Sequence, residues 1–300
     1  MDLITGENDN GRRLDRILRK ALPDLPLPLI HRLLRQKQIL VDGKPAKAQD
    51  RINCGAKITV SIIDKIPKQL QPSYSVSCPD IIWQDKGLLA VNKPSGISVH
   101  GPDSLETMVT SYLKDKIPPS LSFKPGPLHR LDKPSSGIVV FSSNIEGARL
   151  FSLLMREHKV KKTYLAVVEG SAKEEIWQDD LVRNKKIKKT FISKHETSGK
   201  NAITKITPLA EKNNYTLIKA EIETGRTHQI RAQAAFHGHP LTGDKKYGGH
   251  NFCGSKGTFF LHAWKLEFLD YSIIAPMPQD FKINLKKLNI NIDCIHSSHR

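Results

Sequence analysis

The sequence has little cysteine, no long hydrophobic run and comparatively few acidic residues. Its four cysteines, Cys54, Cys78, Cys253 and Cys294, lie far apart among 300 residues, which argues against a disulfide scaffold and a cysteine-based zinc site. No stretch approaches about 18 consecutive apolar residues, so we expect no membrane-spanning helix. The N-terminus lacks a basic start followed by an apolar run, so we expect no signal peptide. Together these absences predict a cytoplasmic protein with reduced cysteines.

The chain does carry an excess of positive charge. Lys and Arg number 47 against 30 Asp and Glu, which gives a formal net charge of +17. A surplus of this size does not help folding, because like charges repel each other. It is typical of proteins that bind nucleic acids or anionic membranes, and we expect a nucleic acid as the partner.

Much of this charge lies in a compact N-terminal module. Residues 11–60 contain 12 Lys and Arg against four Asp. Apolar residues recur there at helical spacing, at Leu14, Ile17, Leu18 and Leu22. Residues 29–37 repeat the basic amphipathic pattern, 39–45 indicate a strand entering an Asp-Gly turn, and 58–60 indicate a closing strand. Two basic helices beside a hairpin are suited to contact a phosphate backbone.

The module resembles the S4 RNA-binding domain. The matching segments are Arg13-Leu14-Asp15, Val41-Asp42-Gly43-Lys44 and Gly55, and the departures are Pro28 and Ala56. The resemblance implies a small α/β domain over residues 1–63. Its expected RNA contacts are Arg13, Arg16, Arg32, Arg35, Lys37 and Lys44.

The rest of the chain is expected to form a linker and one larger domain. Residues 64–79 are proline-containing and polar, which predicts a semi-extended linker. Residues 80–300 alternate strand, turn and helix patterns, with a polar tail from about residue 286. The expected strands are 81–83, 88–92, 137–142, 163–168, 216–222 and 259–262, with a helix over 146–158. Since most neighbouring strands are close in sequence, we expect an α+β domain with a mixed, largely antiparallel sheet.

One long basic segment is assigned to a loop. Residues 183–200 contain seven Lys and Arg and one Glu. The pattern allows either a solvated loop between strands or a loop that contacts RNA.

A carboxylate in a stiff loop is the first candidate catalytic group. Asp132 stands in His129-Arg130-Leu131-Asp132-Lys133-Pro134-Ser135-Ser136-Gly137, directly before an apolar strand. The prolines and the glycine restrict the loop and so fix the direction of Asp132. Neighbouring cations favour its ionised form, which suits a nucleophile or a base. The alternative for a single Asp is a helix cap or a surface ion pair.

A second polar segment follows a strand near residue 222. His228, Arg231 and Ala235 lie at helical spacing, in a run of polar residues dense enough to require partners. One alternative is a zinc or manganese site in a phosphodiesterase, with the ligands His228, His237, His239 and Asp244. No cluster of carboxylates for two metals accompanies them, so we expect no metal.

In combination, the motifs resemble the RluA family of pseudouridine synthases. Beyond the Asp132 segment, the matching motifs are Asn92-Lys93-Pro94-Ser95-Gly96, Lys162-Thr163-Tyr164, Gly225-Arg226-Thr227-His228-Gln229-Ile230-Arg231, Gly238-His239-Pro240-Leu241, Phe260-Leu261-His262-Ala263 and Pro276-Met277-Pro278. They occur in the family's order along nearly the whole chain. Ser135 departs from the family, where Thr is commoner.

The resemblance implies that the protein converts uridines in folded RNA to pseudouridine. Asp132 falls on the catalytic aspartate, which acts either by attack on the substrate or by elimination at the sugar. Arg231 falls on the arginine that pairs with it, and Tyr164 on the tyrosine beside the target base. Arg130 corresponds to the residue that fills the stack vacated by a flipped nucleotide. The further expected substrate-binding residues are His129, Lys93, Arg226 and Leu261, of which Lys93 and Arg226 could instead form internal salt bridges.

The reaction is an isomerisation, so no cofactor is expected. The S4-like module favours large-subunit (23S) ribosomal RNA, or an assembling large subunit, as the partner of a monomeric enzyme. The same chemistry on transfer RNA is the first alternative. An RNA-binding or ribosome-assembly protein without catalysis is the second.

Overall fold

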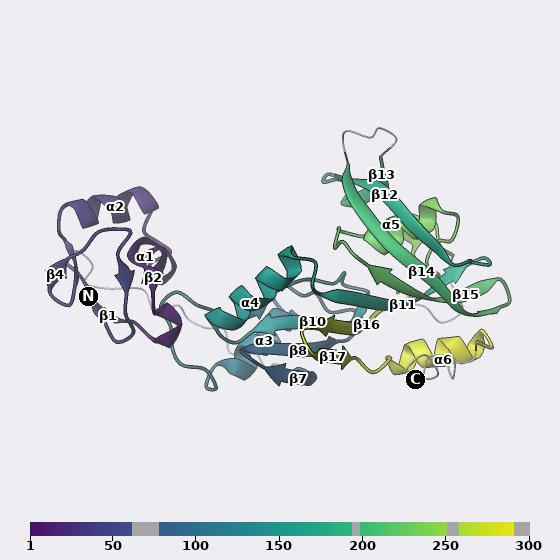
Figure 1. Ribbon diagram of the computed structural model, residues 1–300, viewed down its shortest axis with the longest axis horizontal. Helices are drawn as coiled ribbons and strands as arrows, with labels where there is room; N and C mark the ends of the chain where they lie inside the picture. The colour runs from purple at the N-terminus through teal and green to yellow at the C-terminus, as the bar shows by residue number, and fades with distance from the viewer. Residues whose placement is uncertain (62–77, 194–198, 251–257, 291–300) are drawn as a thin grey trace.

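The computed structural model describes residues 1–61, 78–193, 199–250 and 258–290. Figure 1 shows a small N-terminal unit at one end and a larger unit built around a long sheet. No helix in the described ranges is long and apolar enough to cross a membrane. The predicted linker lies mostly outside these ranges.

The N-terminal unit contains two helices packed on a small sheet. The helices are α1 (Leu14–Ala21) and α2 (Leu27–Arg35). The sheet has the order β1-β6-β3-β4, with β1 (Asp2–Ile4), β3 (Ile39–Val41), β4 (Lys44–Pro45) and β6 (Lys57–Val60), and β2 (Arg12–Arg13) pairs separately with β5 (Arg51–Ile52). The predicted helices, turn and closing strand are thereby confirmed. Strand β1 was not predicted.

The apolar face of α1 explains how this unit stabilises itself. Leu14, Ile17 and Leu18 are fully buried, whereas Arg16 and Arg19 on the same helix are exposed. The buried residues join Ile30 of α2 in a hydrophobic cluster confined mainly to this unit. Removing such an apolar stripe from water supplies the main free energy that holds a short helix in place.

A buried carboxylate connects the N-terminal unit to the larger one. Asp9, in the short helix η1 (Glu7–Asp9), is 0% exposed. It accepts hydrogen bonds from the Ser120 hydroxyl at 2.7 Å, the Leu121 amide at 2.9 Å and the Ser122 amide at 3.0 Å, and also from the Ser122 hydroxyl. Because these bonds favour the charged form against the effect of burial, the pKa of Asp9 is lowered. Asp9 therefore fixes the two units to each other.

The larger unit is built on an 11-stranded sheet with the path β13-β12-β14-β15-β11-β16-β10-β8-β7. Its strands are β7 (Ile81–Asp85), β8 (Leu88–Lys93), β9 (Gly126–Pro127), β10 (Ser136–Ser142), β11 (Lys161–Glu169), β12 (Glu175–Asn184), β13 (Lys189–Ile192), β14 (Lys200–Lys212), β15 (Tyr215–Ile222), β16 (Leu261–Phe268) and β17 (Tyr271–Ile274). In the described part of the chain, β10 and β16 form the one parallel pair. The prediction of a mixed, largely antiparallel sheet is confirmed.

Helices cover both faces of β10, which explains its unbroken apolar sequence. Ile138 and Val140 pack with Phe151 of α4 (Ile145–Arg156). Val139 and Phe141 point to the other face and share a cluster with α3 (Leu105–Leu113). A strand that is buried on both faces loses the usual alternation of polar and apolar residues. The loop that precedes β10 is therefore attached to a strand that is packed on both faces.

Three sequence predictions differ from the structure. The basic segment 183–200 is not one loop, because β12 and β13 pair as a hairpin from Leu181–Ile192 to Asn184–Lys189. The strand predicted at 259–262 starts at Leu261 and continues to Phe268. The ordered chain also extends past the predicted start of the polar tail, since α6 (Gln279–Lys287) is followed by Leu288 and Ile290, which are buried.

Gly137 permits the parallel pairing of β10 with β16. Its φ is +107°, and a Cβ atom there would lie 2.2 Å from the carbonyl oxygen of Ala263. We expect Gly137→Ala to lower the free energy of unfolding by about 2–4 kcal/mol, because the backbone strain and the clash add. Chemical denaturation measures the loss.

Gly101 provides the matched control for this substitution. Its φ is +109°, and a Cβ atom there would have nothing within 4 Å. Gly101→Ala should therefore show the conformational cost alone. An equal loss in the two variants would contradict the importance of the contact with Ala263.

Candidate active site

The residues around Asp132 come from four parts of the fold that meet at one end of the parallel pair. Asp132 lies in the loop between β9 and β10, and Tyr164 lies on β11. Leu261 begins β16, and Arg231 lies on α5 (Gln229–Phe236). The sheet order places β11, β16 and β10 side by side, which explains why residues so distant in sequence share a site.

The loop that carries Asp132 is anchored at both ends. Before it, the Leu128 amide donates to the Val140 carbonyl at 2.8 Å, and His129 Nε2 accepts from the Val140 amide at 3.0 Å. After it, the Ser135 amide donates to the Asp132 carbonyl at 3.1 Å. Because the backbone is bonded on either side, the Asp132 side chain has a defined direction.

Arg231 joins two carboxylates. Its Nη1 donates to Asp132 Oδ2 at 2.7 Å, while its Nε and Nη2 donate to Asp244 at 2.6 and 2.8 Å. The Asp244 side chain is 1% exposed and that of Asp132 is 18% exposed. The bidentate pair with Asp244 thus fixes the guanidinium, and the remaining Nη1 holds the more accessible Asp132.

Aromatic rings on two sides complete the environment of Arg231. Its guanidinium carbon lies 4.9 Å from the ring centre of Tyr247 and 4.3 Å from that of Phe259. Burial opposes the charge, but Asp244 and Asp132 outweigh it and raise the pKa of Arg231. Arg231 is therefore a permanent cation in a fixed position.

His228 makes a second contact with Asp132. It has φ +57° immediately before α5, and its Nε2 lies 3.6 Å from Asp132 Oδ1. Its Nδ1 lies 2.8 Å from Tyr247 Oη, which itself accepts from the Thr190 amide at 2.8 Å. The Tyr247 hydroxyl hydrogen is then available to Nδ1, which leaves the imidazole proton on Nε2, facing Asp132.

Burial favours the neutral form of this histidine. The pKa of His228 is lowered because desolvation outweighs the attraction of Asp132. At neutral pH His228 is accordingly neutral, and Arg231 supplies the counter-charge of Asp132.

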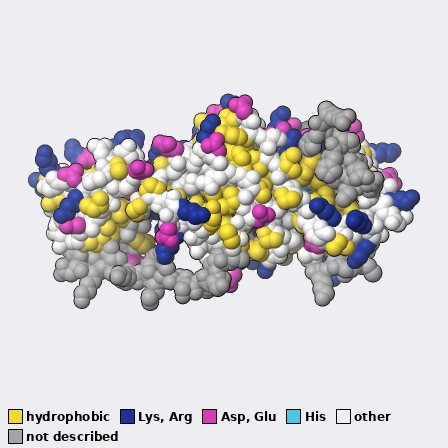
Figure 2. Space-filling view, turned by 90° about the horizontal axis from the view of Figure 1, so that it is seen from below, with side chains coloured by type: hydrophobic (Ala, Val, Ile, Leu, Met, Phe, Trp, Pro, Cys, Tyr) yellow, Lys and Arg dark blue, Asp and Glu magenta, His cyan; other side chains and the backbone are white. Residues whose placement is uncertain are grey.

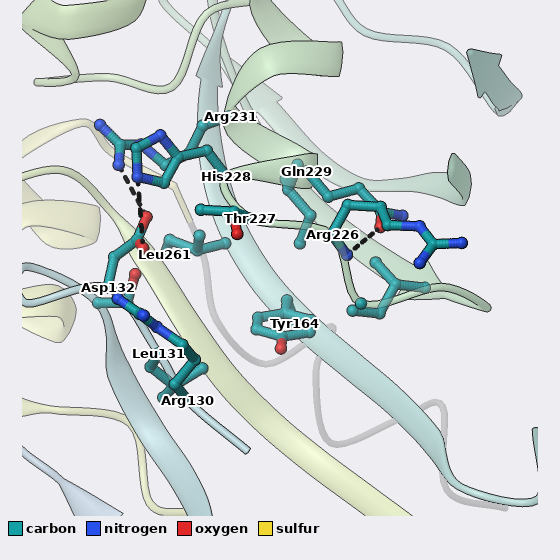
Figure 3. Close-up of a pocket in the computed structure, with 14 residues that line it drawn as sticks. Arg130, Leu131, Asp132, Tyr164, Arg226, Thr227, His228, Gln229, Arg231 and Leu261 are labelled. Atoms are coloured by element: carbon teal, nitrogen blue, oxygen red, sulfur yellow. Dashed lines mark hydrogen bonds and ion pairs between the residues drawn. The ribbon is translucent and has the colours of Figure 1, made fainter. Parts of the chain in front are cut away.

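Tyr164 lies in a hollow next to Asp132, of about 130 Å³. Leu131, Ile222, Ile230 and Leu261 also line this hollow and belong to the same hydrophobic cluster as Tyr164. Figure 3 shows the ring of Tyr164 between the Asp132–Arg231 pair on one side and Arg226 on the other. Burial and the charge of Asp132 raise the pKa of Tyr164, so its hydroxyl stays protonated. A hollow that combines apolar side chains with a carboxylate and several polar groups is suited to a planar ring attached to a polar group.

The structure brings most of the predicted site residues together. Asp132, Tyr164, Arg231, Arg130, Arg226 and Leu261 all line this hollow. Arg130 is exposed at its edge. Arg226 is held by a hydrogen bond from its Nε to the Asn201 carbonyl at 3.1 Å.

Two predicted substrate-binding residues have other roles. Lys93 is 0% exposed, and its ammonium donates to the carbonyls of Pro94, Ile97 and Lys133 at 2.9, 2.8 and 3.2 Å. It can reach no phosphate, and it forms no salt bridge within 4.0 Å among the described residues. His129 lies outside the hollow, stacked on Phe151 at 6.1 Å, and burial lowers its pKa to about 3. Both residues hold the loop rather than the substrate.

Lys93 is expected to contribute strongly to stability. Burial lowers its pKa to about 8, although Asp132 opposes the shift, and three acceptors match the three donors of the ammonium form. We expect Lys93→Met to lower the free energy of unfolding by about 2–4 kcal/mol, since three carbonyls lose a charged donor. The exposed neighbour Lys133 is the control, and Lys133→Met should change stability by less than about 0.5 kcal/mol. Thermal or urea denaturation that gave equal losses would contradict this role.

The four residues of the metal alternative have separate partners. His228 contacts Tyr247 and Asp132, and Asp244 contacts Arg231, as described above. His237 bonds to Asp179 at 3.1 Å, and His239 bonds to the Glu169 carbonyl at 3.1 Å. Within the part of the chain that the structure describes, no three His, Cys, Asp or Glu side chains gather at a metal-binding distance.

The predicted RNA contacts of the N-terminal unit are on its surface. Exposed side chains among them are Arg16, Arg32, Arg35, Lys37 and Lys44. Arg13 is exposed too, but forms an ion pair with Asp15 at 2.7 Å. Figure 2 shows Lys and Arg side chains at both ends of the molecule, over the N-terminal unit on the left and over the opposite end.

Sequence reasoning did not assign roles to three residues that hold the site. Asp244 and Tyr247 lie in the Gly-rich loop after Leu241, and His228 lies in the Arg-Thr-His-Gln segment. His228 and Asp244 had been considered as metal ligands, and Gly243-Asp244 as part of a family motif, without a role beside Arg231. Their roles could have been inferred from Arg231, because a buried guanidinium has more N–H donors than Asp132 alone can accept.

Comparison with known proteins identifies related chains. The family described as RNA pseudouridylate synthase matches residues 87–236. A protein of Bacillus subtilis named "Uncharacterized RNA pseudouridine synthase YlyB" is 29% identical, over 97% of this chain and 99% of its own. The "Ribosomal large subunit pseudouridine synthase C" of Vibrio parahaemolyticus is 30% identical, over 94% of this chain and 96% of its own. The structure of "Human RNA Pseudouridylate Synthase Domain Containing 4" is 23% identical and superposes with a TM-score of 0.60, covering 70% of this chain and 92% of its own.

Proposed function

This chain belongs to the RNA pseudouridylate synthase family, and from that premise we propose that it isomerises specific uridines of large-subunit (23S) ribosomal RNA, with Asp132 as its essential group and without a cofactor. The enzyme class itself, an RNA pseudouridine synthase and hence an isomerase, follows from the family. The observation that carries the proposed mechanism is the Asp132–Arg231–Asp244 arrangement beside the Tyr164 hollow.

The reaction requires the target base to leave its stack. The bond between N1 and C1′ breaks, the uracil rotates, and a bond between C5 and C1′ forms, while C5 loses a proton and N1 gains one. These atoms are not accessible within a stacked helix, so the nucleotide must be flipped out, at a cost of a few kcal/mol. In this proposal Arg130, which is exposed and lines the hollow, occupies the vacated stack.

The hollow is suited to the flipped base. Tyr164 offers a flat face, and base–aromatic stacking contributes about 1–3 kcal/mol per base. Leu261 and Ile230 add apolar contacts. The uracil ring would lie on Tyr164, with its ribose toward Asp132.

Asp132 acts at the sugar in this proposal. Arg231 Nη1 holds its Oδ2 at 2.7 Å, and His228 Nε2 lies 3.6 Å from its Oδ1. A carboxylate oxygen held beside the ribose is suited either to attack the sugar or to initiate elimination there. Atoms and charge balance over the whole reaction, so it requires no external electron or group donor.

The choice of ribosomal RNA rests on relatives and on charge. The relatives named for the large ribosomal subunit match over most of this chain. The N-terminal unit presents basic side chains on two helices, as expected of an S4-like domain that anchors folded RNA. We further propose that a monomer acts in the cytoplasm, on 23S RNA or on an assembling large subunit.

Pseudouridine mapping tests the function. Ribosomal and transfer RNA would be mapped in a strain that lacks this protein and after complementation with the wild-type gene. We expect one or more 23S uridines to lose the modification in the deletion strain and regain it on complementation. Loss confined to transfer RNA would overturn the ribosomal assignment, and an unchanged map would overturn the function.

A further inference from the structure

A second hollow adjoins the one that holds Tyr164. It measures about 340 Å³, against about 130 Å³ for the first. The two share the residues at their boundary, Arg130, Leu131, Asp132, His228 and Arg231. Asp132 is therefore accessible from both sides of the boundary.

The second hollow is lined by cations from separate parts of the fold. Arg130 and Lys133 come from the loop before β10, Arg183 and Lys188 from the β12–β13 hairpin, and Lys246 from η2 (Lys245–Tyr247). All five are exposed. The five residues span more than 100 positions of the sequence, from Arg130 to Lys246, so folding brings these charges together.

These cations have no acidic counterpart in the described part of the chain. The one carboxylate that lines the hollow is Asp132, which is paired with Arg231. None of the five exposed cations forms an ion pair with a described carboxylate within 4.0 Å. Like charges placed together repel each other, so this arrangement favours an anion that lies among them.

Some of these side chains are already held in place. Arg183 Nη1 donates to Thr227 Oγ1 at 3.1 Å, next to His228. Lys246 Nζ donates to the Lys188 carbonyl at 2.6 Å, which ties η2 to the hairpin. Burial and the neighbouring Arg231 lower the pKa of Lys246, as expected for a cation in a positive environment. Cations that are fixed before binding lose less side-chain entropy when an anion arrives.

We propose that the second hollow binds the phosphodiester backbone next to the flipped uridine, through Lys133, Arg183, Lys188 and Lys246. This inference rests on the proposed function, because the position of the ribose defines which side the phosphates take. A ribose joins a base on one side to phosphates on the other. With the base on Tyr164 and the sugar at Asp132, the flanking phosphates extend across the boundary into the second hollow.

The test measures RNA binding by the triple variant Arg183→Ala, Lys188→Ala, Lys246→Ala. Binding is measured in the Asp132→Asn background, so that it does not depend on turnover. The probe is a short hairpin RNA with uridines in its loop, titrated at a series of KCl concentrations. Each lost phosphate contact lowers the slope of log affinity against log salt by about 0.7–0.9. We therefore expect the slope to fall by about two units in the triple variant.

A matched variant removes the same amount of charge elsewhere. Lys212, Lys286 and Lys287 are exposed and line neither hollow. Their triple alanine variant should keep a slope within about half a unit of the parent value, since these lysines contact no phosphate in the proposal. Equal slopes for the two triple variants would overturn the assignment.

Uncharged phosphate analogues show which phosphates of the RNA the three cations contact. A second hairpin carries methylphosphonates in the loop only. The parent protein should bind it at least about tenfold more weakly than the normal hairpin, whereas the triple variant should bind both within about twofold. If the triple variant loses as much affinity as the parent, the contacted phosphates are not those beside the loop uridines and the proposal is wrong.

These measurements separate the proposal from the proposed function. An unchanged pseudouridine map with a positive methylphosphonate result would overturn the proposed function but keep the phosphate site. A changed map with equal salt slopes would keep the function and remove the site.

Discussion

Replacing Asp132 by Asn will abolish pseudouridine formation while RNA binding persists. The amide has the shape of the carboxylate but lacks its charge, so it can neither attack the sugar nor remove a proton. Loss of a group that acts directly on the reacting atoms lowers turnover by at least about 10³-fold. Arg231 remains fixed by its two bonds to Asp244, so the fold should tolerate the change.

Single-turnover conversion of a ribosomal RNA fragment measures this effect. Asp115→Asn is the control, because Asp115 is an exposed carboxylate that lines neither hollow. The control should convert RNA at the wild-type rate. Conversion by Asp132→Asn within tenfold of wild type would remove Asp132 from the mechanism.

Replacing Arg231 by Met should damage both activity and stability. Asp132 loses its counter-charge, and the buried Asp244 is left without its bidentate partner. Breaking a buried ion pair on one side costs about 3–5 kcal/mol, because the remaining charge stays out of water. Activity should fall at least about 10²-fold, even where the variant is folded, because Asp132 is no longer oriented.

A double variant separates the two effects. Arg231→Met with Asp244→Asn removes the unpaired buried charge, so denaturation should show recovery of about 2 kcal/mol or more relative to Arg231→Met. Activity should not recover, because Asp132 still lacks Arg231. Recovery of both quantities together would show that Arg231 only maintains the fold.

The buried strand β10 and the helix α4 could be predicted from the sequence because burial leaves a pattern of apolar residues. A strand covered on both faces, such as β10, is apolar throughout, and α4 shows its buried face at helical spacing. The hairpin of β12 and β13 was missed because β12 is mostly exposed, with Trp177 and Leu181 as its buried residues, and β13 is only four residues long. Their pairing depends on backbone hydrogen bonds, which leave little pattern in the side chains.

The role of a site residue could be predicted where the residue stands in a recognisable motif. It could be predicted less well where the role depends on contacts that only the folded chain makes. The resemblance implied the pairing of Asp132 with Arg231, and the structure places the two in contact at 2.7 Å. The sequence left Lys93 between a phosphate contact and an internal salt bridge, and only the folded loop reveals its three carbonyl partners. The participation of Asp244 depends on a loop conformation that sequence spacing does not define.

The attachment through Asp9 has a consequence for the choice of target. Because this buried carboxylate bonds to Ser120, Leu121 and Ser122, the span between the two basic helices and Asp132 is set by the protein alone. An RNA that occupies both regions can present only uridines at that separation from the bound element. Distance along a folded RNA, rather than the bases around the uridine, would then decide which nucleotides are reached.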